Sequence, residues 1–161
     1  MDKHALRHAL GGFATGVCVM TVPDPDQKSG HVLGLTANSF TSVSLEPPLI
    51  LWCLDDRAHR YDIYARASAF GINILSGGQD DLSRRFARDN AHIVPEEGLI
   101  SPLHPLRLKN VVAFLKCDVQ DRYPVGDHLV IVGRVKSFDR DDTQAGLTFF
   151  KGQYGQIGGM L

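Results

Sequence analysis

The stretch that most constrains the fold of this chain is Gly34–Leu49, with the sequence GLTANSFTSVSLEPPL. It begins as a β-strand, in which successive side chains point to opposite faces. It carries a dense run of small polar side chains, which are Thr36, Asn38, Ser39, Thr41, Ser42 and Ser44. Pro47 and Pro48 then interrupt strand pairing because neither has an N–H to donate, and the apolar run Leu49–Trp52 follows. The pattern predicts a small polar concavity between two strands, which suits a flat ligand with polar atoms along its edge. A Ser/Thr-rich edge strand followed by a turn explains the same residues.

The other apolar runs predict a mainly β, antiparallel domain with about six strands and three short helices. The expected strands are 17–22, 31–40, 49–54, 69–75, 111–123 and 128–138, and residues 147–154 form a short apolar and aromatic segment. The expected helices are 2–10, 60–67 and 80–90, with turns at 13–16 and 141–146 and a proline-containing loop at 91–108. Hairpin connections rather than crossover helices favour a closed barrel with peripheral helices. The length of 161 residues predicts one domain over 1–161.

The composition argues against a nucleic-acid-binding, membrane-spanning or secreted protein. The formal net charge of -1 provides no basic field for nucleic acid. No apolar run approaches the ~20 residues of a membrane span, and the first ten residues lack the apolar core of a signal peptide. Cys18, Cys53 and Cys117 lie in apolar runs, which predicts buried free thiols in a reducing cytoplasm. His4 and His8 are spaced to share a metal, but no third ligand lies near them, so we expect no metal site.

Five motifs occur in a fixed order along the chain: TGVCVMTV, GLTANSFTSVSLEPPLI, FGINIL, GDHLVIVGRV and LTFFKGQYG. Together they resemble the short-chain flavin reductase family, over nearly the whole chain. The resemblance implies an FMN-binding, antiparallel split β-barrel with a few short peripheral helices. It also implies NAD(P)H-dependent reduction of FMN or FAD, a homodimer, and a separate oxygenase component that receives the reduced flavin.

Candidate flavin ligands follow from the polar run and from the basic residues near two predicted helices. Thr36, Ala37, Asn38 and Ser39 are predicted to contact the ring edge, and Ser42 and Ser44 the ribityl chain or phosphate. Arg57 and His59 flank a predicted helix start, which favours an anion such as the flavin phosphate, although a solvated helix cap would look the same. The remaining candidates are Arg85 for the phosphate and Asn73, which faces the ligand or simply bonds to backbone.

Candidate nicotinamide-binding residues rest on the resemblance. The histidine of the matching GDH motif, His128, would lie near the nicotinamide and orient its carboxamide. In relatives the C-terminal segment meets the nicotinamide dinucleotide, and its matching residues here are Phe149, Tyr154 and Gly155. Thr15 is a further candidate for that pocket.

Two functions remain open at this point. In the first, the chain is an NAD(P)H:flavin oxidoreductase that releases reduced flavin to a partner monooxygenase. Hydride transfer between two bound cofactors needs no protein nucleophile, and the chain carries no hydrolase, zincin or Walker motif. In the second, it is a flavoredoxin-like electron carrier that holds FMN tightly and turns over little NAD(P)H. The preferred flavin and nicotinamide are not set by the sequence.

Overall fold

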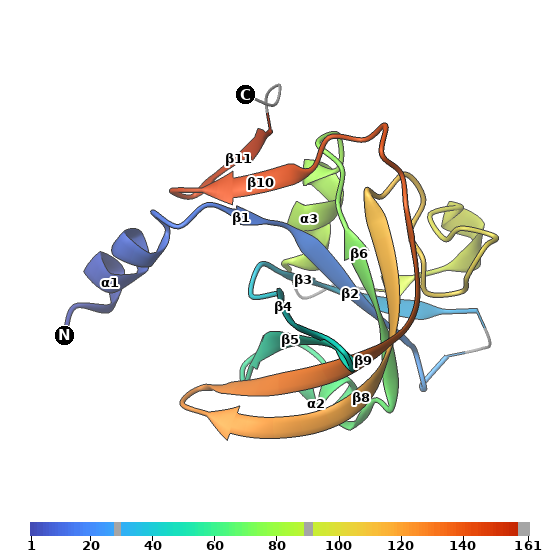
Figure 1. The fold of residues 1–161 in the computed structure, drawn as a ribbon, viewed down its shortest axis with the longest axis horizontal. Coiled ribbons are helices and arrows are strands. Elements are labelled where there is room, and N and C mark those ends of the chain that lie inside the picture. Colours follow the sequence, from blue (N-terminus) through green and yellow to red (C-terminus); the bar gives the residue numbers. More distant parts are fainter. Residues whose placement is uncertain (28–29, 89–91, 158–161) are drawn as a thin grey trace.

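The protein is mainly β and antiparallel in a computed structural model that describes residues 1–27, 30–88 and 92–157. An eight-stranded sheet has the order β4-β5-β9-β8-β6-β2-β3-β7, and a three-stranded sheet has the order β1-β10-β11 (Figure 1). The strands are β1 Thr15–Gly16, β2 Cys18–Pro23, β3 Val32–Ala37, β4 Thr41–Leu45, β5 Pro48–Asp55, β6 Ala69–Ile74, β7 His92–Ile93, β8 Ala113–Val125, β9 His128–Arg140, β10 Leu147–Phe150 and β11 Gln153–Gln156. The helices are α1 Lys3–Leu10, α2 Tyr61–Arg66, α3 Asp80–Phe86 and the short 3₁₀ helix η1 Pro95–Glu97.

The predicted mainly β, antiparallel class is confirmed, as are the β8–β9 hairpin and the three α-helices. The predicted number of strands was wrong. Residues 13–16 were expected to be a turn, but Thr15 and Gly16 pair with Thr148 and Phe149 of β10. Residues 147–154 form β10 and the first half of β11, which pair as an antiparallel hairpin. Short strands such as β1 and β7 carry too few residues to show alternation, so only their partners reveal them. The predicted helix 80–90 ends at Phe86, and its residues 89 and 90 lie outside the described part.

The sequence left two interpretations of the polar run open, a concavity and an edge strand, and each describes one half of the run. Residues 41–45 form β4, an edge strand of the large sheet that pairs only with β5. Pro47 follows a cis peptide bond in the β4–β5 turn, and Pro48 begins β5. Residues 36–39 of the run therefore border the concavity together with residues from other segments, and the second half of the run is a Ser/Thr-rich edge strand.

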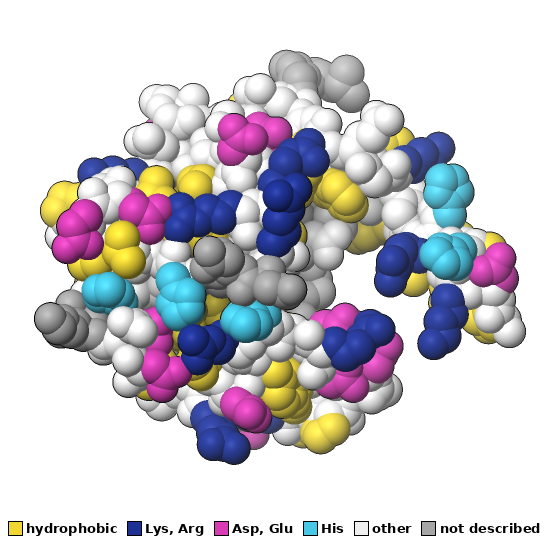
Figure 2. Space-filling view, turned by 180° about the vertical axis from the view of Figure 1, so that it is seen from behind, with side chains coloured by type: hydrophobic (Ala, Val, Ile, Leu, Met, Phe, Trp, Pro, Cys, Tyr) yellow, Lys and Arg dark blue, Asp and Glu magenta, His cyan; other side chains and the backbone are white. Residues whose placement is uncertain are grey.

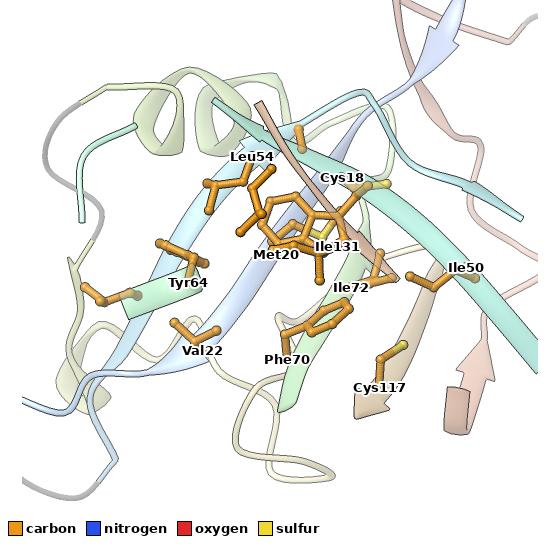
Figure 3. Packing of buried hydrophobic residues seen from close by; sticks show 14 residues of the cluster. Cys18, Met20, Val22, Ile50, Leu54, Tyr64, Phe70, Ile72, Cys117 and Ile131 are labelled. Atoms are coloured by element: carbon orange, nitrogen blue, oxygen red, sulfur yellow. The ribbon is translucent and has the colours of Figure 1, made fainter. Parts of the chain in front are cut away.

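The large sheet encloses a tightly packed core. Trp52 of β5 lies edge-on to Tyr64 of α2, with 6.4 Å between ring centroids, and to Phe70 of β6 at 5.9 Å. Cys18 and Cys117 are buried in the same cluster (Figure 3). A second cluster, which includes Val19, Phe86 and Leu147, joins the large sheet to α3 and to the small sheet. The core fixes the strand ends, and loops at those ends form the site.

The N-terminal helix α1 projects from the body of the protein (Figure 1). Its N-cap is Asp2, whose carboxylate accepts a 2.8 Å hydrogen bond from the backbone N–H of His4. None of its residues is buried. Its end is held by a 2.8 Å hydrogen bond from the Lys151 N–H, in the β10–β11 turn, to the carbonyl of Gly11. In the described ranges, no helix is long and apolar enough to cross a membrane.

Candidate functional site

A cavity of about 350 Å³ lies where the end of β3, the end of β5, the start of β9 and the C-terminal end of α3 meet. We call it the polar cavity. It is lined by Leu35, Thr36, Ala37, Asn38, Ser39, Cys53, Asp55, Arg57, Ala58, Phe86, Ala87, Arg88 and His128. Six of these residues were predicted from the sequence as ligands, and segments far apart in the chain bring them together.

The bend after β3 is held by its own hydroxyl groups. Thr36 Oγ1 donates a 2.7 Å hydrogen bond to the carbonyl of Ser83 in α3. Ser39 Oγ accepts a 3.0 Å bond from the Cys53 N–H and donates a 3.1 Å bond to the Cys53 carbonyl. These two side chains therefore position the backbone of residues 36–39, and Asn38 presents an exposed amide in the cavity.

The opposite rim carries charge. The Arg57 guanidinium donates two 3.1 Å hydrogen bonds to Asp55, and its backbone N–H donates a third of 2.9 Å. Hydrogen bonds from Arg57 lower the pKa of the Asp55 carboxyl to about 2. His128 Nδ1 lies 2.8 Å from the Asp127 carboxylate, which leaves Nε2 free to meet a ligand. The rim thus carries the Arg57–Asp55 ion pair beside an oriented imidazole.

The third wall is one that sequence reasoning missed. Phe86, Ala87 and Arg88 at the end of α3 line the cavity, although none of them was among the ligands predicted from the sequence. A Cβ built on Gly34 of β3 would lie 2.9 Å from the Phe86 ring, so only glycine lets α3 approach this closely. A glycine inside a predicted strand was the available signal for such an approach.

A second depression of about 810 Å³ lies between α1 and the body, and we call it the arm hollow. It is lined by His4, Arg7, His8, Leu10, Gly11, Phe13, Thr15, Asn38, Phe149, Lys151 and Gly152. Asn38 lines both depressions, so they adjoin. The Oγ1 atom of Thr15 is buried and has no hydrogen-bond partner among the described residues.

Tyr154 and Gly155 do not line the arm hollow, and Tyr154 pairs with Phe149 across β10 and β11. The Tyr154 hydroxyl is 2.8 Å from Ser83 Oγ, and its ring lies 5.1 Å from that of Phe149. The Arg84 guanidinium stacks over the Tyr154 ring at 4.6 Å. Ser83 therefore links the C-terminal hairpin to Thr36 at the edge of the polar cavity.

A model of the flavin reductase like domain matches residues 10–158. The chain belongs to the flavin reductase family. It is 41% identical over 155 residues to a probable flavin reductase of Rhizobium meliloti, a match that covers 95% of this chain and 48% of that protein. It is 33% identical over 156 residues to the reductase component of 4-hydroxyphenylacetate 3-monooxygenase of Thermus thermophilus, and this match covers 96% of the chain and 97% of the relative. The solved structure of a Streptomyces globisporus NADH:FAD oxidoreductase, in complex with NAD and FAD fragments, superposes with a TM-score of 0.85 at 30% identity, covering 98% of this chain and 93% of that one.

This member of the flavin reductase family spans about half the length of the Rhizobium meliloti relative and nearly all of the Thermus thermophilus relative. The motifs quoted from the sequence therefore indicate the right family.

Besides Tyr154 and Gly155, five predicted site residues lie outside both depressions. Asn73 is fully buried: its Nδ2 lies 3.1 Å from the Val19 carbonyl, and its Oδ1 accepts a 2.7 Å bond from the Leu108 N–H. Of its two predicted roles, bonding to the protein's own backbone is the observed one. Arg85 pairs with Glu97 and donates a 2.6 Å bond to the His92 carbonyl, so its guanidinium is occupied. His59, Ser42 and Ser44 are not among the lining residues.

Proposed function

We propose that this chain is an NAD(P)H-dependent flavin reductase that transfers hydride from the nicotinamide to FMN or FAD and supplies reduced flavin to a separate monooxygenase. The observation that carries the proposal is the pair of adjoining depressions that share Asn38, one polar and one larger. Hydride transfer needs two cofactors held face to face, which requires two connected sites. The relative from Thermus thermophilus is a monooxygenase reductase component, and the structural neighbour is an NADH:FAD oxidoreductase, which supports the assignment.

In the proposed arrangement, the flavin ring lies along residues 36–39, and its phosphate points toward Arg57 and Arg88. The polar cavity suits such a group because its walls combine an exposed amide, backbone at a strand end and two arginines. Its volume of about 350 Å³ lies at the lower end of the ~300–1,000 Å³ typical of ligand sites. Thr15 and Phe149 in the arm hollow are proposed to contact the nicotinamide nucleotide.

The chain's own residues bind and orient, and they need not exchange protons in the hydride step. When bound, the flavin supplies the hydride acceptor. Asn38 and the backbone at residues 36–39 offer hydrogen bonds where the reduced ring gains negative charge. His128, fixed by Asp127, is proposed to hold the nicotinamide carboxamide through Nε2. His128 lines the polar cavity and Phe149 lines the arm hollow, so a test must separate the effect of His128 on flavin from its effect on nicotinamide.

We also propose that residues 1–161 form one split-barrel domain. The small sheet continues into the large one, because only Val17 separates β1 from β2. The Ser39–Cys53 hydrogen bonds tie the bend after β3 to β5, which lies at the other side of the large sheet, and so support closure of the barrel.

A homodimer is proposed as well, since Leu6 and Leu10 of α1 and nearby Phe13 are exposed and a second copy would cover apolar surface of this kind. The three cysteines are free, which supports a reducing, cytoplasmic setting.

The decisive experiment is steady-state oxidation of NADH and NADPH by the purified protein, with FMN or FAD added or left out. Turnover that rises with added flavin identifies a reductase and reveals the preferred pair. If flavin binds tightly and neither nucleotide is consumed, the reductase assignment fails and the flavoredoxin-like carrier becomes the better account.

A second experiment tests whether His128 contacts the nicotinamide or the flavin. His128→Ala is expected to raise the KM for the nicotinamide more than the KM for flavin. His59→Ala is the control, because His59 is an exposed histidine near the same rim but does not line the cavity, whereas His128 is half-buried and lines it. A larger rise in the flavin KM would place His128 at the flavin instead, and no change in either would remove it from the site.

A further inference from the structure

Ser83 is a buried polar residue inside α3, with 0% of its surface exposed. A buried hydroxyl is unfavourable unless it has a hydrogen-bond partner. The partner of Ser83 Oγ is the hydroxyl of Tyr154, which lies 2.8 Å away on β11 and so joins the C-terminal hairpin to α3. Alanine has the higher helix propensity, so this serine is explained by its hydrogen bond rather than by the helix.

The carbonyl of Ser83 contacts the polar cavity side of the same helix. It accepts the helical hydrogen bond from the Ala87 N–H at 3.1 Å and a second bond of 2.7 Å from Thr36 Oγ1. A carbonyl oxygen has two lone pairs, so both bonds form together. Thr36 and Ala87 both line the polar cavity. Ser83 therefore connects the C-terminal hairpin to two walls of that cavity, although it lines neither depression itself.

The position of α3 depends on contacts of this kind. The helix has seven residues, and a helix this short is not stable by itself. On one side Phe86 packs against Gly34 of β3. On the other side the Arg84 guanidinium lies 4.6 Å from the centre of the Tyr154 ring. Arg84 is exposed, and Figure 2 shows Lys and Arg side chains gathered on the face that carries α3. The ring and the hydroxyl of Tyr154 together hold α3 from the side of the hairpin.

We propose that Ser83 is a positioning residue of the flavin site, which fixes Thr36 through its carbonyl and the C-terminal hairpin through Tyr154. The proposal rests on the proposed function and extends it, because it assigns a role to a residue outside both depressions. Phe149 pairs with Tyr154 in the hairpin and lines the arm hollow, whereas Thr36 lines the polar cavity. Ser83 thus sets the spacing between the two proposed cofactor sites.

This spacing matters for the proposed reaction. One hydride, with its two electrons, passes from the reduced nicotinamide ring to the oxidised flavin ring, so the nicotinamide is oxidised and the flavin is reduced. The reacting atoms must lie about 3–3.5 Å apart, and a displacement of about 1 Å can slow such a step about 100-fold. A residue that holds both sites in place therefore affects the rate without touching either cofactor.

The test removes one hydroxyl from either side of the bond. Ser83→Ala and Tyr154→Phe each delete a single oxygen atom, and the backbone carbonyl that binds Thr36 is kept in both. We expect each variant to raise the dissociation constant for flavin about threefold and to slow flavin reduction at saturating reduced nucleotide about three- to tenfold. Tyr123→Phe is the matched control, because Tyr123 is an exposed tyrosine of β8 that lines neither depression. The control should leave both values within about twofold of wild type.

The double variant separates positioning from stability. Each single variant leaves one hydroxyl of the pair without its partner and should lower Tm, whereas the double variant leaves none and should recover part of that loss. The link between the hairpin and α3 is absent in all three variants. Flavin binding and flavin reduction in the double variant should therefore be as weak as in the single variants. If both recover together with Tm, Ser83 acts through stability alone and the proposal is overturned.

Flavin titration keeps this test independent of turnover. If the wild type binds flavin but oxidises neither NADH nor NADPH, the function proposed above fails. A raised dissociation constant for flavin in both single variants, and in the double variant, would still assign Ser83 to the flavin site. Unchanged constants in Ser83→Ala and Tyr154→Phe would refute the positioning role whatever the activity. A wild type that binds no flavin would refute both proposals.

Discussion

Replacing Gly34 by alanine tests whether the approach of α3 to β3 builds the polar cavity. The added Cβ would lie 2.9, 3.1 and 3.2 Å from three atoms of the Phe86 ring, whereas ordinary contacts are 3.4–4 Å. Phe86 is 1% exposed, so its ring has no open space to enter. The ring and the end of α3 must therefore move away by about 0.5 Å. Phe86, Ala87 and Arg88 move with it, and all three line the cavity.

The expected loss of stability follows from two opposing effects. Overpacking of a well-packed interior costs about 1–3 kcal/mol. Alanine also restricts the unfolded chain more than glycine does, which stabilises the fold by about 0.4–1 kcal/mol. The hydrogen bond from Thr36 to Ser83 limits how far α3 can slide. We expect a net loss of about 1–2 kcal/mol, which lowers Tm by roughly 3–6 °C for a domain of this size.

The assay is thermal unfolding of Gly34→Ala, together with the KM for flavin in the reductase assay. Gly78→Ala is the matched control, because a Cβ there meets nothing within 4 Å. The control should keep the wild-type Tm within about 1 °C or rise slightly. Gly34→Ala should also raise the flavin KM, since one wall of the polar cavity has moved.

A double variant isolates the clash as the cause. Phe86→Leu alone should destabilise the protein by removing buried ring atoms. In the Phe86→Leu background, however, the further cost of Gly34→Ala should shrink or vanish, because the ring that it meets is gone. An unchanged Tm for Gly34→Ala, or an equal cost in both backgrounds, would refute the packing argument.

Three further predictions concern the rim of the polar cavity. Asn38→Ala should raise the flavin KM with little change in Tm, because the Asn38 amide is exposed. Ser39→Ala should instead lower the free energy of unfolding by about 1 kcal/mol, because its hydrogen bonds to Cys53 are lost, and denaturant unfolding measures this change. The Asp55 carboxyl has a pKa of about 2, below its ordinary value of about 3.9, so its contribution to stability is complete above pH ~4 and is lost as pH falls toward 2. Arg57→Gln should shrink that loss in an acid titration of Tm, because it brings the pKa of Asp55 back toward its ordinary value, and an unchanged profile would contradict the role of the Asp55–Arg57 pair. A thiol reagent should modify Cys53 first among the three cysteines, as peptide mass analysis would show, and bound flavin should slow the modification.

The order of reactivity among the cysteines follows from burial. Burial raises the pKa of both Cys18 and Cys117 to about 12, so each stays a protonated thiol at neutral pH. Cys53 is half-buried and lines the polar cavity. Equal labelling of all three thiols in the folded protein would contradict the packing of the core.

The sequence by itself determined the class of the fold and the approximate positions of its longer elements. Apolar runs mark β3, β5 and β6, and turn residues mark the β8–β9 hairpin. Asp2 and Gly11 mark the two ends of α1. These signals are local, because strand alternation and helix capping depend on neighbouring residues. The motifs in their order also predicted the family correctly.

Only the tertiary structure decided which polar residues reach the site. Asn73 has its hydrogen-bond partners at Val19 and Leu108, more than thirty residues away, so the sequence gives no sign that it is satisfied in the core. Arg88 resembles any solvated arginine until the fit of Phe86 over Gly34 turns the end of α3 into a cavity wall. The place of α1 beside the β10–β11 turn depends on the hydrogen bond from the Lys151 N–H to the Gly11 carbonyl, which joins segments far apart in the chain. Each of these outcomes depends on a contact between distant segments, and such contacts leave no local pattern in the chain.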